Sequence, residues 1–571
     1  MNRSKEFSID LVFVTYNSSK WICNCFASLC RQTYPKEKMF VYVVDNASTD
    51  DTIQILRQER AVLERAGISC ELIPAGSNLG FGKANNLGFS KGHSKIVSFL
   101  NIDTELEPDA ISELAAEIRT DMTTKGNRFA LWELRQFPYE HPKLYDPITH
   151  ETSWSSGAAF AVRRDVYQKL GGFDPQLFMY AEDVDLSWRI RSYGYRLKYV
   201  PRAVIRHYSY TTAGEVKPLQ YTNSIVNNLL LRYRFGGPGT IAIGHILFWK
   251  VLLRQSPFPD ARRLLLQQYI EHFRQMPYFL HKKGKVGRRH FRGNFLGFDY
   301  AAIREGAFYE NEYPETEPLV SIIVRTCGRP DVLRETLQSL RWQTYKNIEI
   351  MVIEDGENSA EEMIRKEFSD LNIRYQATGE KVGRSKAGNI AITNARGKYI
   401  NFLDDDDVFY ADHVEVLVKT LERNPEKRAA YAFAYATPIV VKSRSPYRYK
   451  LMDYQGIHKQ KFDRVQLCHH NYIPIQCIMF EKSLFEEYGG LDESLDALED
   501  WDLWVRYSLH TDFACVEKTT SEYRIPYDQK EDAKRQKDLD DALIVVRKKH
   551  KGYVQNVSAY DLAKLYEGQG R

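Results

Sequence analysis

The sequence predicts two α/β domains of the same kind in tandem, each built on an open, mostly parallel sheet. Two observations predict this arrangement. An ordered set of motifs occurs twice, about 300 residues apart: LNID at 100–103 returns as LDDDD at 403–407, and AEDVDLSWR at 181–189 returns as LEDWDLWVR at 498–506. In each copy, short apolar runs alternate with segments of helical pattern, as in parallel sheets with crossover helices.

The elements of the first copy follow in a regular order. We expect strands at 9–15, 40–44, 70–74 and 96–100, and helices at 20–31, 52–66 and from about residue 83. The second copy repeats this order, with strands at 320–324, 349–353, 373–376 and 399–403, and helices at 333–342, 360–368 and 384–394. Ligands of such sheets bind beyond the carboxyl ends of the strands, and the repeated motifs fall at those ends.

The chain is expected to divide into four parts. These are a first domain at 1–230, a basic helical linker segment at 231–315, a second domain at 316–530 and a charged helical tail at 531–571. Prolines and glycines break the linker segment into short helices.

Charge is distributed unevenly along the 571 residues, although the net charge is only +4. Residues 232–292 contain 13 Lys and Arg but 2 Asp and Glu, so this segment carries +11 and the remainder of the chain −7. A basic segment that also contains leucines and aromatic residues is either a helical spacer or a patch for anionic lipid. The sequence opens without a signal peptide and has no run of 18 apolar residues, which indicates a cytoplasmic protein.

An acidic residue ends the second strand of each copy. Asp45 lies in VVDNAS, and Glu354 and Asp355 lie in VIEDGEN. A carboxylate in this place can accept hydrogen bonds from a nucleotide base or a ribose. Acids at strand ends also commonly begin turns, which is the alternative interpretation.

A glycine-containing loop follows in each copy. NLGFGKANN at 78–86 and EKVGRSKAGN at 380–389 place Lys83 and Lys386 at the start of a helix. Glycines allow the backbone to approach a phosphate closely, and the lysines add positive charge there. The alternative is a glycine turn that precedes an ordinary helix.

Acidic motifs end the fourth strand. Asn101 and Asp103 in the first copy, and Asp404 and Asp406 in the second, are spaced so that alternate side chains point the same way. Clustered oxygens suit a hard divalent ion, Mg²⁺ or Mn²⁺, with positions left for diphosphate oxygens. A solvated acidic loop is the alternative, although adjacent aspartates repel one another.

A second acidic motif follows a GGFD or GGLD turn. Its members are Glu182, Asp183 and Asp185 in the first copy, and Glu499, Asp500 and Asp502 in the second. One carboxylate of each set can act as general base for an attacking hydroxyl group. The alternative is a helix whose first turn favours acidic residues because of the helix dipole.

Taken in order, these motifs resemble the family-two glycosyltransferases of the GT-A (nucleotide-diphospho-sugar transferase) fold. The first copy carries TYN, DNAS, NLGFGKANN, LNID, GGFD, YAEDVDLSWR and PRAVIRH, and the second carries RTCGRP, QTY, LDDDD, GGLDESLDALEDWDLWVR and TSEYR. The first copy is similar to the rhamnosyltransferase-like branch of bacterial surface-polysaccharide (O-antigen or capsule) enzymes. The resemblance covers about 430 residues.

The resemblance implies a role for each motif residue. The implied catalytic bases are Asp183 and Asp500. The implied metal ligands are Asp103, His207 and Asp406. The implied contacts to the nucleotide sugar are Asp45, Lys83, Asn101, Glu354, Asp355, Lys386, Asp404 and Asp405. The implied acceptor or supporting residues are Glu182, Asp185, Glu499 and Asp502.

The chain departs from the family pattern in two places. Asn101 stands where the family usually has the first aspartate of its DxD motif. Tyr523 or Arg524 stands in the second copy at the place of His207.

The activity implied is a bifunctional, metal-dependent, inverting transfer of two sugars. UDP- or dTDP-sugars are the expected donors, and a growing, lipid-linked bacterial surface polysaccharide is the expected acceptor. Such an enzyme is expected in the cytoplasm or peripherally on the inner face of the cell membrane, with contact to anionic lipid and no nucleic-acid partner. Three alternatives are one catalytic domain beside a non-catalytic acceptor-binding module, a nucleotidyltransferase, and a non-catalytic glycan-binding scaffold.

Overall fold

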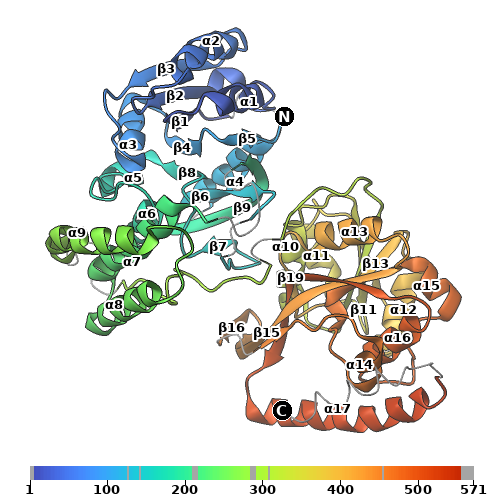
Figure 1. The fold of residues 1–571 in the computed structure, drawn as a ribbon. Helices are drawn as coiled ribbons and strands as arrows, with labels where there is room; N and C mark the ends of the chain where they lie inside the picture. The colour runs from blue at the N-terminus through green and yellow to red at the C-terminus, as the bar shows by residue number, and fades with distance from the viewer. Residues whose placement is uncertain are drawn as a thin grey trace. The chain divides into compact units, whose positions relative to one another are not determined.

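The computed structural model describes residues 6–124, 126, 128–140, 143–208, 216–282, 291–306, 309–452 and 456–553. The chain forms two compact units, Met1–Asn311 and Glu312–Arg571, and each is described here by itself (Figure 1). No helix among these residues combines the length and the apolar character needed to cross a membrane.

The first unit contains a mixed sheet with helices on both faces. Its strands are β1 (Ile9–Thr15), β2 (Met39–Asp45), β3 (Ser69–Pro74), β4 (Ile96–Asn101), β5 (Thr104–Leu106), β6 (Phe129–Phe137), β7 (Glu151–Thr152), β8 (Ala159–Arg163) and β9 (Arg196–His207). Its helices are α1 (Ser19–Cys30), α2 (Thr52–Arg65), α3 (Phe81–Lys91), α4 (Ala110–Thr123), α5 (Arg164–Leu170), α6 (Glu182–Ser192), α7 (Pro218–Phe235), α8 (Pro238–Leu253) and α9 (Ala261–Lys282).

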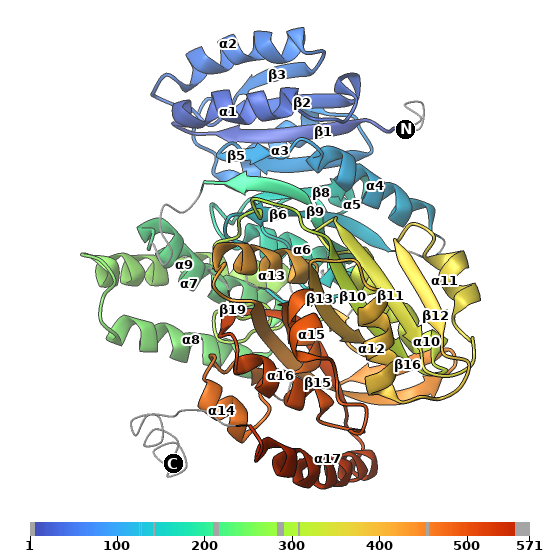
Figure 2. The same cartoon turned by 90° about the vertical axis from the view of Figure 1, so that its right-hand side faces the viewer.

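The second unit repeats this arrangement (Figure 2). Its strands are β10 (Val320–Thr326), β11 (Ile348–Glu354), β12 (Ile373–Ala377), β13 (Tyr399–Asp404), β14 (Val408–Phe409), β15 (Ala429–Arg444), β16 (Tyr447–Leu451), β17 (Gly456–His458), β18 (Ile478–Glu481) and β19 (Phe513–Pro526). Its helices are α10 (Pro330–Arg341), α11 (Glu361–Glu367), α12 (Arg384–Asn394), α13 (His413–Arg423), α14 (Arg464–His469), α15 (Lys482–Tyr488), α16 (Glu499–Ser508) and α17 (Gln529–His550).

The two sheets have the same strand order. It is β3-β2-β1-β4-β8-β6-β9-β5 in the first unit and β12-β11-β10-β13-β18-β15-β19-β14 in the second. This identity of order confirms the predicted pair of α/β domains. The first four strands in each order are parallel, as expected, but β8 and β18 run antiparallel to their neighbours β4 and β13, so each sheet is mixed rather than mostly parallel.

Apolar residues on both faces of the sheet explain the layered packing. In β1, Ile9, Leu11 and Phe13 pack with residues of α1, α2 and α4, whereas Val12 packs on the opposite side with residues of α3, α5 and α6. Successive side chains of a strand point to opposite faces, so an uninterrupted apolar run places helices on both.

The predicted basic linker segment is packed as part of the first unit. The predicted boundary at residue 230 falls inside α7, where Leu229, Leu230 and Leu231 are buried. Leu231 and Phe235 pack on Trp188 of α6, and α8 and α9 pack on α7. A free spacer would leave these leucines in water, so the helices of residues 218–282 associate with the sheet domain instead. The cations at 283–289 lie outside the described residues.

The predicted charged tail begins as a helix that packs on the second unit. Lys549 and His550 of α17, together with Tyr553, contact Asp502 of α16, and Val546 is buried in the core of the unit. The remainder of the tail, residues 554–571, lies outside the described part of the chain.

Candidate functional site

The register of the parallel strands brings the predicted residues of the first unit to one edge of the sheet. Val14 of β1 lies beside Asn101 of β4, and Thr15 lies beside Asp45 of β2. Asp45 is buried, and it accepts hydrogen bonds from Thr15 Oγ1 (3.2 Å) and from the backbone N–H of Ser48 (3.2 Å). Its carboxylate therefore holds the turn after β2.

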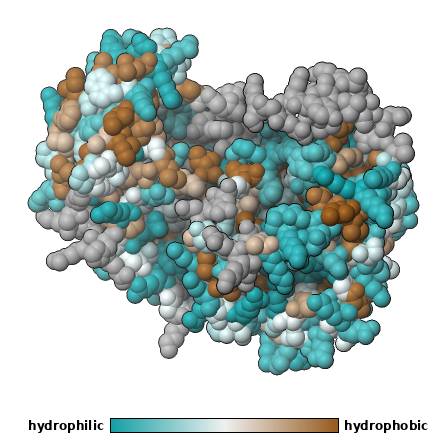
Figure 3. Space-filling view, turned by 90° about the horizontal axis from the view of Figure 1, so that it is seen from below, coloured by the Kyte–Doolittle hydropathy of each residue, from teal (hydrophilic) through white to brown (hydrophobic). Residues whose placement is uncertain are grey.

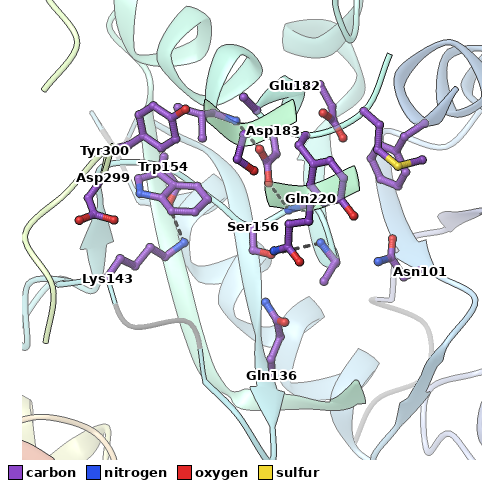
Figure 4. Close-up of a pocket in the computed structure, with 18 of the residues that line it drawn as sticks. Asn101, Gln136, Lys143, Trp154, Ser156, Glu182, Asp183, Gln220, Asp299 and Tyr300 are labelled. Atoms are coloured by element: carbon purple, nitrogen blue, oxygen red, sulfur yellow. Dashed lines mark hydrogen bonds between the residues drawn. The ribbon is translucent and has the colours of Figure 1, made fainter. Parts of the chain in front are cut away.

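A pocket of about 540 Å³ lies beyond this edge in the first unit (Figure 4). It is lined by five of the predicted site residues, namely Asn101, Asp103, Glu182, Asp183 and His207. In the view of Figure 4, Glu182 and Asp183 of α6 lie at the top, Lys143 and Trp154 at the left and Asn101 at the right. Asp45, Lys83 and Asp185 are not part of this lining. Lys83 is exposed in the first turn of α3.

Asp103 and His207 meet because β5 pairs antiparallel with β9, which places Thr104 opposite His207. His207 Nδ1 is 2.8 Å from Gln136 Oε1, so Nδ1 carries the hydrogen and donates it. His207 Nε2 is buried without a hydrogen bond and lies 3.4 Å from Asp103 Oδ1. Burial would raise the pKa of Asp103, but His207, the backbone N–H of Asp103 and Lys217 together outweigh burial and lower it.

This pair fits a divalent ion. A carboxylate and an imidazole nitrogen oriented by an amide oxygen are ligands that Mn²⁺ accepts, and an ion there would satisfy the unpaired Nε2. The described residues contain no group of three or more His, Cys, Asp and Glu that could hold a metal alone. The remaining ligands would therefore have to come from a substrate or water.

Asp183 is held at the first turn of α6 by two backbone groups. Its Oδ2 accepts a hydrogen bond from the N–H of Gly157 (2.8 Å), and its Oδ1 accepts one from the N–H of Val184 (2.8 Å). The preceding Ala181 has a φ of 67°, a conformation that is rare outside glycine and often found at functional sites. Burial raises the pKa of Asp183, and burial together with Asp183 raises the pKa of Glu182 well above its usual value.

Asp185 lies in a buried ion-pair cluster away from the pocket. It pairs with Arg189 Nε (2.7 Å) on its own helix and with Arg234 of α7. Arg234 also pairs with Asp174 Oδ2 (2.5 Å), which belongs to the GGFD turn. The predicted acceptor role of Asp185 has no support in this position, because its carboxylate joins α6, α7 and the turn.

The second unit repeats the geometry around the catalytic candidate. Leu498 has a φ of 59° immediately before α16. Asp500 Oδ1 accepts a hydrogen bond from the N–H of Trp501 (2.7 Å), and Oδ2 accepts one from Asn471 Nδ2 (3.0 Å). Burial and then the neighbouring Glu499 raise the pKa of Asp500 to about 7. Asp502, like Asp185, is paired with the arginine four residues later, here Arg506 (3.0 Å).

Arginine side chains pair with the acidic motif of the second unit. Arg325 lies where the first unit has Val14, and its Nε and Nη2 bind Asp404 at 2.8 and 2.9 Å. The same guanidinium binds Glu499 (3.0 Å), so it links the two acidic motifs of this unit. Burial would raise the pKa of Asp404, but Arg325, with Arg384 and Arg329, outweighs burial and lowers it.

The other aspartates of this motif are also engaged. Asp405 is buried and pairs with Arg329, which also lies 3.2 Å from Asp406. Asp407 is buried and accepts the backbone N–H of Arg524 (2.8 Å). The register of β14 and β19 aligns Tyr523 with the place of His207. This set lacks the carboxylate–imidazole pair of the first unit, and Arg325 and Arg329 offset part of its charge.

The remaining predicted residues of the second unit hold loops. Glu354 accepts hydrogen bonds from the N–H groups of Ser359 (3.0 Å) and Ala360 (3.1 Å), and with other donors these lower its pKa despite burial. Asp355 Oδ1 accepts the N–H of Val382 (2.6 Å) in the glycine-containing loop. Lys386 is exposed in the first turn of α12.

Several pocket residues of the first unit were not predicted from the sequence. The buried Lys143 pairs with Glu133 and donates to the carbonyl of Trp154 (2.6 Å), and Gln136 orients His207. Residues of α7 and of the segment that the sequence predicted as a linker also line the pocket, namely Gln220, Ser224, Phe298, Asp299 and Tyr300. The sequence contained one signal for these residues: Glu133 and Gln136 interrupt the apolar run of β6. Polar groups inside a buried strand need a hydrogen-bond or ion-pair partner.

Comparison with known proteins gives matches in both units. A family model described as glycosyl transferase family 2 matches residues 10–182 and 321–489, and one described as glycosyl transferase family group 2 matches residues 97–280. An uncharacterized glycosyltransferase of Rickettsia prowazekii is 32% identical over 193 residues, which are 33% of this chain and 58% of that protein. The chain thus spans a little more than half the length of this relative.

Two further relatives have more specific names. The N-acetylglucosaminyl-diphospho-decaprenol L-rhamnosyltransferase of Mycobacterium tuberculosis is 28% identical over 248 residues, covering 36% of this chain and 78% of that protein. Among solved structures, a mannosyltransferase of Pyrobaculum calidifontis in complex with GDP-Man and Mn²⁺ is 18% identical with a TM-score of 0.32, covering 50% of this chain and 75% of that one.

The family assignment depends only on the family model described as glycosyl transferase family 2. Its two matches cover more than half of the chain, and one lies in each of the two units that share a strand order. The chain therefore belongs to glycosyl transferase family 2, with one GT-A domain of the family in each unit.

Proposed function

We propose that the chain is a bifunctional inverting glycosyltransferase, in which each unit transfers one sugar from a nucleotide-diphospho-sugar to a growing glycan. The observation that supports this most strongly is the repeated placement of one carboxylate. Asp183 and Asp500 are each the second residue of a helix that a residue of left-handed conformation precedes, and each accepts the N–H of the next residue. Both lie near the strand ends where the acidic motifs are found.

The proposed chemistry is a single displacement. Asp183 or Asp500 takes the proton of an acceptor hydroxyl group while that oxygen bonds to the anomeric carbon, and the bond from this carbon to the diphosphate breaks. Burial and Asp183 raise the pKa of Glu182 and favour its protonated form, and Asp185 is occupied by Arg189 and Arg234. Asp183 is therefore the acid of this motif that remains as a base, and a displacement with one base and no covalent nucleophile inverts the anomeric centre.

The charge of the leaving diphosphate would be balanced differently in the two units. In the first, Asp103 and His207 would hold Mn²⁺ or Mg²⁺, which acts as a Lewis acid toward the diphosphate when bound. In the second, Arg329 is 40% exposed on its side chain and can offer its guanidinium to phosphate oxygens. Asn101 and the exposed lysines Lys83 and Lys386 would contact the donor in both units.

The acceptor proposed is a lipid-linked glycan at the inner face of the cell membrane, with UDP- or dTDP-sugars as donors. The name of the Mycobacterium tuberculosis relative, which describes a sugar linked through diphosphate to decaprenol, supports this choice.

A second candidate is that only the first unit is catalytic and the other binds acceptor. The pairing of Arg325 with Asp404 and Glu499 favours it, since these acids are no longer available to a donor.

A panel of sugar nucleotides tests the proposal. The full chain is incubated with each UDP-, dTDP- and GDP-sugar, and hydrolysis and transfer to short lipid-linked acceptors are measured. The proposal expects two active donors, or one donor used twice, with products of inverted configuration. The proposal is contradicted if none of the sugar nucleotides is hydrolysed or used for transfer. A single transfer that depends only on Asp183 favours the second candidate.

Transfer by the second unit is expected to decline as pH falls through about 7, the raised pKa of Asp500. Protonation at lower pH removes the base. Asn471→Ala should move the midpoint to higher pH, because the hydrogen bond from Asn471 lowers this pKa. The measurement is kcat/KM against pH for each variant, and an unchanged midpoint in Asn471→Ala would exclude Asp500 as the titrating group.

The raised pKa of Asp500 also makes the stability of the second unit depend on pH. The folded-state pKa of Asp500, about 7, lies above the unfolded value of about 3.9, so the group stabilises the fold at low pH. This contribution is lost as pH rises between these two values.

His207→Ala is expected to raise the Mn²⁺ concentration needed for the first transfer by about 10- to 100-fold, the range typical of metal-site residues. The second transfer should not respond to this substitution, because Tyr523 aligns with the place of His207 there. Gln136→Ala, which leaves the imidazole unoriented, should produce a smaller change in the same direction. Metal titrations of both transfers provide the measurement, and identical curves for parent and His207→Ala would remove His207 from the ligand set.

A further inference from the structure

Two neighbouring helices of the first unit expose apolar stripes. On α9, Leu266, Ile270, Phe273, Pro277 and Leu280 are all exposed, and their spacing of three or four residues places them on one face of the helix. The exposed fraction of Ile270 reaches 69%. A soluble helix normally turns such a stripe toward a core.

A second stripe lies on α8. Its exposed apolar residues are Ile243, Ile246, Trp249 and Leu253, and Leu253 is 79% exposed. The opposite side of α8 is already buried, since Phe248 stacks on Tyr269 of α9 with ring centroids 4.0 Å apart. The exposed stripe is therefore not the face that packs on the protein.

The two stripes are adjacent. His245 of α8 stacks on Phe273 of α9 at 6.3 Å, and Trp249 lies 5.8 Å from Tyr269, next to Ile270. Together the nine residues form one surface, here called the α8–α9 surface: Ile243, Ile246, Trp249, Leu253, Leu266, Ile270, Phe273, Pro277 and Leu280. The left part of Figure 3, which views the molecule from the side of α8, shows hydrophobic side chains gathered there among hydrophilic ones.

The charges around this surface are mainly positive. Residues 236–282 include six cations, Lys250, Arg254, Arg262, Arg263, Arg274 and Lys282, but only the two acids Asp260 and Glu271. One of these acids, Asp260, lies 3.6 Å from Arg263. By contrast, Arg232 and Arg234, which the sequence analysis counted in the same basic segment, are buried and hold the unit together.

We propose that the α8–α9 surface docks on an anionic lipid bilayer, with both helices lying in the interface. Apolar stripes would enter the acyl boundary, and the surrounding lysines and arginines would reach the anionic headgroups. An exposed tryptophan suits this depth, because indole favours the membrane–water interface. A protein partner or a second copy with the same net positive charge matches the surrounding cations less well than an anionic bilayer does.

The position of the surface deepens the proposed function, on which this part of the inference rests. α8 and α9 both pack on α7, whose Gln220 and Ser224 line the pocket that contains Asp183. Docking through α8 and α9 would therefore hold the acceptor side of the first site at a fixed distance from the headgroups. A lipid-linked acceptor could then reach the base without leaving the membrane.

Vesicle sedimentation of the full chain tests the inference. The parent should sediment with vesicles of phosphatidylglycerol and phosphatidylcholine, and should bind pure phosphatidylcholine at least about tenfold more weakly, with release from anionic vesicles as salt rises. A variant with Ile246→Ser, Trp249→Ser, Ile270→Ser and Phe273→Ser should lose at least about tenfold in binding. A control with Ile53→Ser and Met122→Ser, two exposed apolar residues elsewhere in the same unit, should bind like the parent.

A second measurement remains valid if the fourfold variant is unstable. Vesicles with brominated acyl chains should quench part of the tryptophan fluorescence of the parent, and Trp249→Phe should remove most of this quenching while binding persists. Binding by the parent that is equal for anionic and neutral vesicles, equal binding by the fourfold variant, or unchanged quenching in Trp249→Phe would overturn the inference. A parent that is dimeric in light scattering and becomes monomeric in the fourfold variant would also overturn it, in favour of self-association.

Failure of the inference can be distinguished from failure of the proposed function. Sedimentation requires no turnover, so Asp183→Asn should bind vesicles as well as the parent does. A chain that binds vesicles but transfers no sugar would contradict only the proposed function. A chain that transfers sugar to short soluble acceptors but ignores vesicles would contradict only the docking surface.

Discussion

Asp183→Asn is expected to remove one sugar transfer and to leave the other intact. An amide cannot accept the proton of the acceptor hydroxyl, and general-base catalysis typically contributes about 10²- to 10⁴-fold to a rate. The amide oxygen can still accept one of the two N–H groups that hold the carboxylate, so the fold of the site should persist although the other N–H loses its acceptor. The measurement is the rate of each transfer, assayed with separately supplied acceptors.

Asp500→Asn should give the reciprocal result, because Asp500 has the same geometry in the second unit. Glu182→Gln provides a matched control. Burial and Asp183 raise the pKa of Glu182 and favour its neutral form, which glutamine resembles in charge and shape, so most of the first transfer should remain. If either asparagine variant removed both transfers on separate acceptors, the two units would not be independent sites.

Arg234→Met is expected to destabilise the first unit by about 3–5 kcal/mol, the cost typical of leaving a buried charge without its partner. Arg234 is 1% exposed and balances Asp185, which is fully buried, as well as Asp174. Removing the guanidinium leaves Asp174 without its ion-pair partner and Asp185 with Arg189 alone. Denaturant unfolding monitored separately for the two units should show an early transition of the first unit only.

Two variants serve as controls for this effect. Arg234→Met combined with Asp174→Asn and Asp185→Asn removes the unbalanced charges and should recover part of the lost stability. Lys549→Met is the corresponding change in the second unit, where Lys549 bridges Asp492 and Asp502. Its side chain is 31% exposed, so water compensates part of the loss and the effect should be smaller. An unchanged unfolding midpoint in Arg234→Met would show that α7 does not need this ion pair.

The ion-pair cluster also connects stability to catalysis. Arg234 of α7 and Arg189 of α6 fix Asp185, two residues after Asp183 on the same helix turn. A surviving Arg234→Met protein should therefore show a lower kcat for the first transfer with less change in KM for the donor. The second transfer should not change, since its cluster uses Arg506 and Lys549.

The sequence alone was sufficient to predict the duplication and the parallel strands of both units. The strand at 9–15 and the helix at 384–394 were predicted with their observed bounds, and other predicted ends differ by one to a few residues. These features depend on local patterns, because an apolar run buried on both faces or a glycine before a helix is read within about ten residues. The acidic motifs were found for the same reason, since each is continuous in the chain.

The tertiary structure alone decided which charges these motifs present. Arg325 reaches Asp404 and Glu499 across 79 and 174 positions of sequence, and Arg234 reaches Asp185 across 49. It also decided that α7, α8 and α9 belong to the first unit, where the sequence suggested a linker. Composition records that a segment is basic, but not whether an arginine is buried against an aspartate or exposed beside an apolar stripe. Partners far apart in sequence leave no local pattern, because folding alone brings them into contact.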